Sequence, residues 1–170
     1  MLSGMSDSEQ PGSARLERTY DAPAQTVWEL WTTPAGIEAW WSPDGFVTEV
    51  RTLDLRPGGE LVHAMTATAP EQVAFMENAG MPLTNVARKT FTEVSPPTRL
   101  AYRSLIDFVP DREPYEHLTV VDLEPLGDDR VKVVMTVEPL HDATWTERLL
   151  AGRENELDNL AAAIDRRRRR

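Results

Sequence analysis

Six segments with strand-like alternation follow one another from residue 46 to residue 137, and a single long helical segment follows at residues 142–165. Short turns such as Arg56-Pro57-Gly58-Gly59 separate successive strand segments. Strands joined by short turns lie antiparallel. A sheet of this kind must bury one face, and the C-terminal segment is the only predicted helix long enough to cover it.

Another strand and two short helices are predicted before these six segments. Residues 16–20 alternate between apolar and polar, which is typical of a strand. Pro23 and Pro34 each stand near the start of a segment with apolar residues at helical spacing. These residues are Val27, Leu30 and Trp31 in the first segment, then Ile37, Trp40 and Trp41 in the second. The predicted fold class is therefore α+β, a curved seven-stranded antiparallel sheet around a long C-terminal helix.

A further short helix is predicted at residues 70–79, between the second and third of the six strand segments. Pro70 precedes its apolar residues Val73 and Met76, and Gly80 and Pro82 follow them. Because it is short and bounded on both sides by residues that end helices, it is a candidate lid.

The charge distribution predicts three regions: a flexible leader at 1–14, one domain at 15–165 and a basic tail at 166–170. The polar leader lacks the basic and apolar order of a signal peptide. Arg166 to Arg170 form a block of like charge, which is typical of a solvated tail. A return of this block onto the acidic body, or a weak contact with nucleic acid, stays open.

Several classes of function are excluded or disfavoured by composition. The net charge of −10 argues against a specific nucleic-acid partner. The absence of cysteine excludes disulfides, thiolate metal sites and cysteine nucleophiles, and it is consistent with a cytoplasmic location. No apolar run approaches the roughly 20 residues of a membrane span. We expect a monomer or homodimer without a cofactor.

The segments RTYDAPAQTVWELWTTPAGIEAWWSP, LRPGGEL and FTEVSPPTRLAY resemble the START-related helix-grip (SRPBCC) superfamily. Within it, the sequence is similar to homologues of the C-terminal domain of the activator of the heat-shock chaperone ATPase, over about residues 16–164. This resemblance implies a hydrophobic or amphipathic ligand cavity between the sheet and the long helix. Members of the superfamily include polyketide cyclases, lipid and hormone carriers, and co-chaperones of the stress response.

The resemblance supports two hypotheses of function. The first is binding of a small hydrophobic or amphipathic ligand, either alone or with cyclase-like enzymatic activity. The alternative is a chaperone-regulating or other protein-interaction module. The sequence contains no nucleophile elbow, phosphate-binding glycine loop or metalloprotease motif, so it leaves open whether a reaction is catalysed.

Strand alternation and helical spacing select the candidate ligand-binding residues. They are Trp40, Trp41, His63, Met65, Met76, Tyr102, Ser104, His117, Met135, Trp145 and Arg153. His63 and His117 lie in the apolar phase of their strands, where each is either a ligand-binding group or a hydrogen-bonded core histidine. Nothing in the sequence brings them together with His141, so no metal site is expected.

Arg153 interrupts the apolar stripe of the long helix, at i+4 from Leu149 and i−4 from Leu157. The resemblance implies a tryptophan at this position. A buried arginine needs an anion or several acceptors, and three alternatives stay open. The side chain pairs with an internal carboxylate, for which Asp107 and Glu113 are candidates, binds an anionic ligand group, or extends to water.

Overall fold

The computed structural model describes residues 12–169. Most of the predicted leader therefore lies outside the described residues, as does Arg170. Ala14, the last residue of that leader, already belongs to the first strand.

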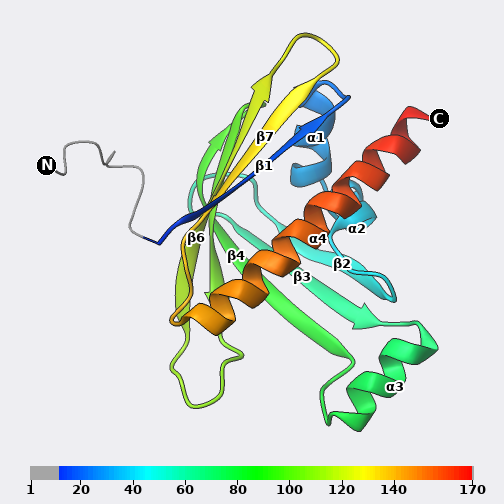
Figure 1. Ribbon diagram of the computed structural model, residues 1–170, viewed down its shortest axis with the longest axis vertical. Helices are drawn as coiled ribbons and strands as arrows, with labels where there is room; N and C mark the ends of the chain where they lie inside the picture. Colours follow the sequence, from blue (N-terminus) through cyan, green and yellow to red (C-terminus); the bar gives the residue numbers. More distant parts are fainter. Residues whose placement is uncertain (1–11, 170) are drawn as a thin grey trace, which may run out of the picture.

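The chain folds as strand, two short helices, two strands, a short helix, four strands and a long helix (Figure 1). The elements are β1 (Ala14–Tyr20), α1 (Ala24–Thr32), α2 (Pro34–Trp40), β2 (Phe46–Leu53), β3 (Glu60–Ala67), α3 (Pro70–Asn78), β4 (Thr84–Ser95), β5 (Arg99–Ile106), β6 (Tyr115–Pro125), β7 (Val131–Val137) and α4 (Ala143–Arg168). The predicted α+β fold class is confirmed. No helix within residues 12–169 is long and apolar enough to cross a membrane.

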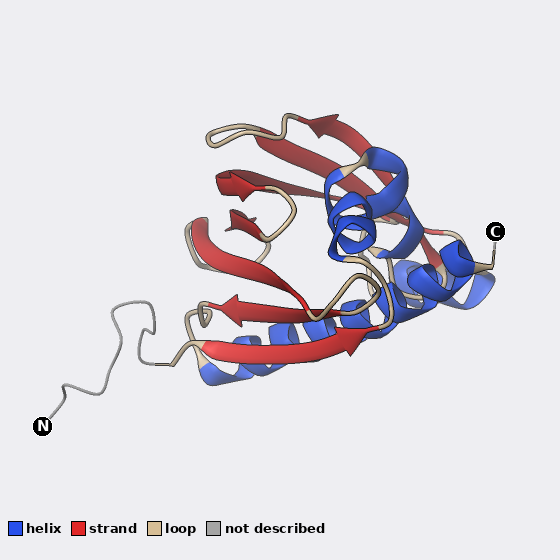
Figure 2. Cartoon of the chain, turned by 90° about the horizontal axis from the view of Figure 1, so that it is seen from above, coloured by secondary structure: helices blue, strands red, loops and turns tan. Residues whose placement is uncertain are grey.

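The seven strands form one antiparallel sheet in the order β1-β7-β6-β5-β4-β3-β2. Successive strands from β2 to β7 are neighbours, as the short turns predict. β1 pairs with β7, so β1 and β2 lie at opposite edges of the sheet. The helices α1 and α2 make the connection between these two edges. Figures 1 and 2 show α4 crossing one face of the curved sheet.

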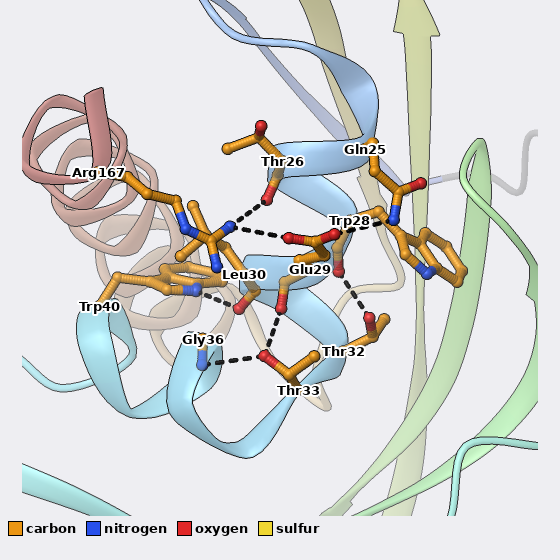
Figure 3. Close-up of polar contacts among 10 residues, drawn as sticks. All are labelled: Gln25, Thr26, Trp28, Glu29, Leu30, Thr32, Thr33, Gly36, Trp40 and Arg167. Atoms are coloured by element: carbon orange, nitrogen blue, oxygen red, sulfur yellow. Dashed lines mark hydrogen bonds and ion pairs between the residues drawn. The ribbon is translucent and has the colours of Figure 1, made fainter. Parts of the chain in front are cut away.

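A cluster of indole rings joins the two short helices. Trp31 and Trp40 pack edge to face with 4.8 Å between ring centroids, and Trp40 and Trp41 lie 4.7 Å apart. The Trp40 Nε1–H donates a hydrogen bond of 2.7 Å to the Leu30 carbonyl (Figure 3). The Thr33 hydroxyl caps α2 by accepting from the Gly36 amide at 3.0 Å. These contacts fix the corner between α1 and α2.

The two halves of α4 differ in how deeply their side chains are buried. In its second half, Leu157, Leu160 and Ile164 are fully buried in the core. The Tyr20 hydroxyl also donates a hydrogen bond of 2.8 Å to the Leu157 carbonyl, which ties β1 to the helix. In the first half, residues 143–152 are exposed or only half-buried. Space between helix and sheet is therefore expected alongside this first half.

The C-terminal arginines extend α4, which continues through Arg168 beyond the predicted start of a tail at 166. Arg166 donates to the Ala39 carbonyl at 2.8 Å. Arg167 donates to the Thr26 carbonyl and pairs with Glu29, both at 3.3 Å (Figure 3). Cationic side chains in the last turn also interact favourably with the helix dipole. Arg166 and Arg167 therefore fold back onto α1 and α2, the arrangement that the sequence had left open.

The predicted short helix is present as α3, which extends away from the rest of the molecule in Figure 1. Met76 is buried, but Phe75 is 63% exposed. No residue of α3 lines the cleft described below. A role as a lid stays a prediction that would require the helix to move.

The α1–α2 corner should be intolerant of a side chain at Gly36. A Cβ atom there would meet the Glu29 carbonyl oxygen and lie 2.7 Å from the Leu30 Cα, so backbone would have to shift. We expect Gly36→Ala to lower the free energy of unfolding by about 1–3 kcal/mol in urea titrations. Gly152→Ala is the matched control, because its Cβ would have nothing within 4 Å and helices favour alanine. Equal stability of the two variants would contradict this account of the corner.

Candidate functional site: a cleft between the sheet and α4

A cleft of about 330 Å³ opens between β3, β4, β5 and β6 on one side and the first half of α4 on the other. Its wall combines apolar side chains with charged and polar ones. The lining residues used below are Trp41, His63, Met65, Lys89, Ser104, Ile106, Phe108, His117, Leu149, Arg153 and Glu156. The cleft lies where α4 leaves the sheet, because its buried leucines begin only at Leu157.

Lys89 is the central cation of this cleft and is only 5% exposed. It stands on the inner face of β4, opposite Ser104 of β5 in the strand register. Its Nζ lies 3.1 Å from the His63 Nε2, 5.0 Å from the centroid of the Trp41 ring and 5.8 Å from that of Tyr102. Among residues 12–169, no ion pair joins this ammonium to a carboxylate. The stabilising contacts of Lys89 are thus one imidazole nitrogen and two aromatic faces.

Arg153 is also buried, but its charge is matched within α4. Its Nη1 donates to the Glu156 carboxylate at 2.8 Å, an i,i+3 ion pair. Neither Asp107 nor Glu113 is its partner. Both are exposed, whereas Glu156 lies one helical turn away on the same helix face. Glu156 and Tyr102 raise the pKa of Arg153 overall, although burial acts in the opposite direction.

The buried charges shift the protonation of the whole cluster. Burial and the Arg153 guanidinium lower the pKa of Lys89 to about 7, against an opposite effect of Glu156. Burial, Lys89 and Arg153 lower the pKa of His63 to about 3. Burial and Arg153 are the main causes that lower the pKa of His117 to about 4. Burial raises the pKa of Tyr102 to about 12. Both histidines are therefore neutral at pH 7, and Lys89 is a mixture of the protonated ammonium and the neutral amine.

Several polar atoms of the lining residues have no hydrogen-bond partner within the described chain. They are the His63 Nδ1, the Ser104 Oγ, the His117 Nε2 and the Arg153 Nε. The His117 Nδ1 lies 3.3 Å from the Glu138 carbonyl and can only donate to it, so the Nε2 of the neutral ring is an acceptor. The Arg153 Nε–H is a donor. Buried polar groups are normally satisfied, so these four atoms are the groups of the cleft lining that are available for a further hydrogen bond.

The predicted site residues separate into two groups. Trp41, His63, Met65, Ser104, His117 and Arg153 line the cleft. The other five lie elsewhere: Trp40 and Met135 are in the core, Met76 is on α3, Tyr102 is buried beside Lys89, and Trp145 packs on Phe108 at the beginning of α4. The neighbouring tryptophans thus face different surroundings, Trp40 toward the Leu30 carbonyl and Trp41 toward the cleft.

Lys89 and Glu156 were not predicted from the sequence. A signal for Lys89 exists, because it shares the inward phase of β4 with Ala87 and Phe91. The register shift after Phe91 obscures this alternation over the length of the strand. Glu156 lies three residues from Arg153, a spacing typical of helical ion pairs. No group of three described His, Cys, Asp or Glu side chains could hold a metal ion.

An antiparallel sheet that curves around one long C-terminal helix, with two short helices between its edge strands, defines a helix-grip domain of the SRPBCC class. Residues 21–165 match the family described as "Activator of Hsp90 ATPase homolog 1-like protein", and the chain belongs to this family. A comparison with curated proteins found no match.

Solved structures of the same fold come from several bacteria. A protein from Chromobacterium violaceum is 25% identical, with a TM-score of 0.69 over 89% of this chain and 96% of that one. The AHSA1 protein from Silicibacter pomeroyi is 20% identical, with a TM-score of 0.69 over 91% and 98%. The AHSA1-like protein from Aeromonas hydrophila is 23% identical, with a TM-score of 0.63 over 90% and 92%.

The buried histidines should make the protein sensitive to acid. Their pKa values are depressed in the folded state, so the unfolded chain binds protons between about pH 6.5 and pH 4 that the folded chain does not. Stability should therefore fall as the pH drops through this window, by up to about 1.4 kcal/mol per pH unit for each histidine. We expect urea titrations of His63→Gln/His117→Gln to show a shallower fall than the wild type.

The single variants His63→Gln and His117→Gln should each remove part of this fall, because each imidazole is buried and its pKa is depressed in the folded state. A double variant that loses stability as steeply as the wild type between pH 7 and pH 4 would show that other groups dominate acid unfolding.

Proposed function

We propose that the protein binds a small amphipathic ligand in the cleft, with the polar end of the ligand at Lys89 and its apolar part along the cleft wall. The observation that carries this proposal is the buried Lys89 ammonium, which lines the cleft without a paired carboxylate. Burying a charge is unfavourable unless a partner compensates it. A ligand with an anionic or strongly polar end would supply that partner.

The size and lining of the cleft suit such a ligand. Its volume of about 330 Å³ is at the small end of the range for small-molecule sites. Trp41, Ile106, Phe108 and Leu149 provide apolar surface on both the sheet side and the helix side. Phe108 is 59% exposed, so a ligand that covers its ring would gain hydrophobic free energy.

The balance of charge favours an anionic end. With Lys89 protonated, the cleft holds two buried cations, Lys89 and Arg153, against the single carboxylate of Glu156. The third cation of the lining, Arg88, is exposed and pairs with Glu60 at 3.7 Å. Because the Arg153–Glu156 pair is internally matched, the positive charge available to a ligand resides mainly on Lys89. Of the alternatives left open for Arg153, the proposal adopts the internal ion pair, with Glu156 as the partner, and the anionic end of the ligand lies at Lys89.

Variants at the three charged positions test this assignment. We expect the wild type to prefer octanoate over octanol in calorimetric titrations, and Lys89→Met to weaken octanoate binding by about 2 kcal/mol or more. Arg153→Met should also weaken octanoate, since it leaves the Glu156 carboxylate unmatched. Arg153→Met/Glu156→Met should restore the preference, because Lys89 again provides the net charge.

Two results would oppose the assignment. An octanoate preference that survives in Lys89→Met would remove the ammonium from the head-group site. Failure of the double variant to recover octanoate binding, in a protein that still binds octanol, would instead place the carboxylate directly on Arg153. Arg103→Met is a suitable control, because Arg103 is exposed and does not line the cleft.

A second candidate function, a protein-interaction module, is favoured by exposed apolar side chains in and after α3. Phe75 is 63% exposed, Met81 47% and Val86 45%. α3 makes few contacts with the sheet and extends from the molecule (Figure 1). Exposed apolar groups of this kind are typical of protein contacts, and the family description names an activator of a chaperone ATPase.

An ATPase assay distinguishes this second candidate. If α3 contacts an Hsp90-type chaperone, the protein should raise the ATPase rate of that chaperone, and Phe75→Ser/Met81→Ser should abolish most of the increase. Leu126→Ser is the control, since Leu126 is 48% exposed at the distant β6–β7 turn. No change in the ATPase rate with wild-type protein, or equal stimulation by the α3 variant, would remove the support for this function.

A further inference from the structure

The sequence contains two lysines, and their surroundings differ sharply. Lys132 lies on β7, with its side chain 33% exposed and paired with Glu17 at 3.2 Å. Lys89 lies inside the cleft between aromatic rings and a neutral imidazole. The surroundings of Lys89 suit an amine that acts as a nucleophile, because a desolvated ammonium beside another cation readily loses its proton.

We infer that Lys89 forms an imine with an aldehyde or ketone that carries an apolar chain and binds in the cleft. This inference rests on the proposed ligand-binding function of the same cleft and adds a covalent step to it. The geometry that carries it is the placement of the Lys89 Nζ on the cleft wall, 3.1 Å from the His63 Nε2 and over the Trp41 ring.

The charged groups around Lys89 make its neutral form available. Burial and the Arg153 guanidinium of α4 lower the pKa of Lys89, and Glu156 of α4 acts in the opposite direction, which leaves the pKa at about 7. The other titratable groups that face it are His63 from β3, Tyr102 from β5 and His117 from β6. At pH 7 all three are neutral. About half of the Lys89 side chains are then free amines, against a fraction on the order of 10⁻³ for an ordinary lysine.

The covalent step is a condensation without any redox change. The Nζ lone pair forms a bond to the carbonyl carbon, and the π pair of the carbonyl moves to its oxygen. Both hydrogens of the neutral amine then leave with that oxygen as water, and the lone pair on nitrogen completes the C=N bond. Uptake of one proton from solvent gives the iminium ion.

The side chains around Lys89 suit each stage of this condensation. The His63 Nε2 lies 3.1 Å from the Lys89 Nζ and can accept a hydrogen bond from the amine, which orients the nitrogen lone pair while the amine protons pass to the former carbonyl oxygen. Ser104 is the cross-strand neighbour of Lys89, and its hydroxyl has no hydrogen-bond partner within residues 12–169, so it is free to donate to the carbonyl oxygen. The faces of Trp41 and Tyr102 stabilise the cationic iminium.

Reductive trapping of the intact protein tests the inference. The full-length chain is incubated at pH 7 with octanal and sodium cyanoborohydride, which reduces an iminium to a stable secondary amine. Peptide mapping by mass spectrometry then measures the rate of octyl labelling at Lys89, at Lys132 and at the amino terminus. We expect Lys89 to be labelled at least about tenfold faster than Lys132, because the Lys89 amine lies on the cleft wall, whereas Lys132 is held outside the cleft in an ion pair with Glu17.

The comparison within one native protein avoids any dependence on how well a variant folds. Excess octanol, which occupies the cleft without reacting, should slow labelling at Lys89 and leave Lys132 unchanged. Lys132→Arg should retain the adduct, and Lys89→Arg should lose it while keeping a cation at the site. Equal rates at the two lysines, or an adduct that persists in Lys89→Arg, would overturn the inference.

The trapping experiment also separates this inference from the proposed function. If octanol and octanoate bind in calorimetric titrations but Lys89 is not labelled, ligand binding stands and the imine is refuted. If neither compound binds and Lys89 is not labelled, both are refuted. Labelling of Lys89 that octanol does not slow would refute the placement of the reaction in the cleft.

Discussion

The burial of one sheet face by the second half of α4 is the contact on which the rest of the structure depends. The inner side chains of seven strands need an apolar cover, and Leu157, Leu160 and Ile164 provide much of it. The Tyr20 hydroxyl joins the first strand to the same stretch of helix. The short helices α1 and α2 complete the cover with their indole cluster. The fully buried apolar residues of α4 are concentrated in its second half, whereas Leu149 and Leu150 of the first half are only half-buried against the core. The cleft therefore opens beside the first half.

The cleft holds polar groups that a purely structural core would avoid. Two buried cations, two neutral histidines and a serine face a space with only one carboxylate. Replacing buried charges by apolar groups of similar volume is often neutral or stabilising. Retaining them therefore costs stability, and the proposed binding of a ligand in the cleft would give a physical reason for that cost. The depressed pKa of Lys89 follows from the same burial and from the nearby Arg153.

Membership of the Hsp90 ATPase activator homologue family identifies the fold, while the side chains of this chain determine the charges that line the cleft. Arg153 stands where the family resemblance implies a tryptophan, and Glu156 one turn later compensates its charge. Lys89 then contributes a positive charge that no described carboxylate matches. Under the proposed function, a ligand for this chain is consequently expected to be more polar at one end than a ligand for an all-apolar cavity.

Periodicity was sufficient to predict the seven strands, the two short helices and the apolar stripe of α4, and the short turns predicted that the strands from β2 to β7 are antiparallel neighbours. The pairing of β1 with β7 was not predicted. The inner phase of β3 and β5 also placed His63 and Ser104 on the correct face, because side chains alternate strictly along a strand. The sequence pattern could not assign Tyr102, Met135 and Trp40 to the core rather than the cleft, since both surroundings select apolar inward side chains.

The sequence pattern also could not show which charged side chains contact one another. The pairing of Arg153 with Glu156, the contact of Lys89 with His63, and the return of Arg167 to Glu29 depend on distances that only the packed chain determines. Electrostatic interactions and burial act through space, so the chemistry of the cleft was decided by the tertiary structure.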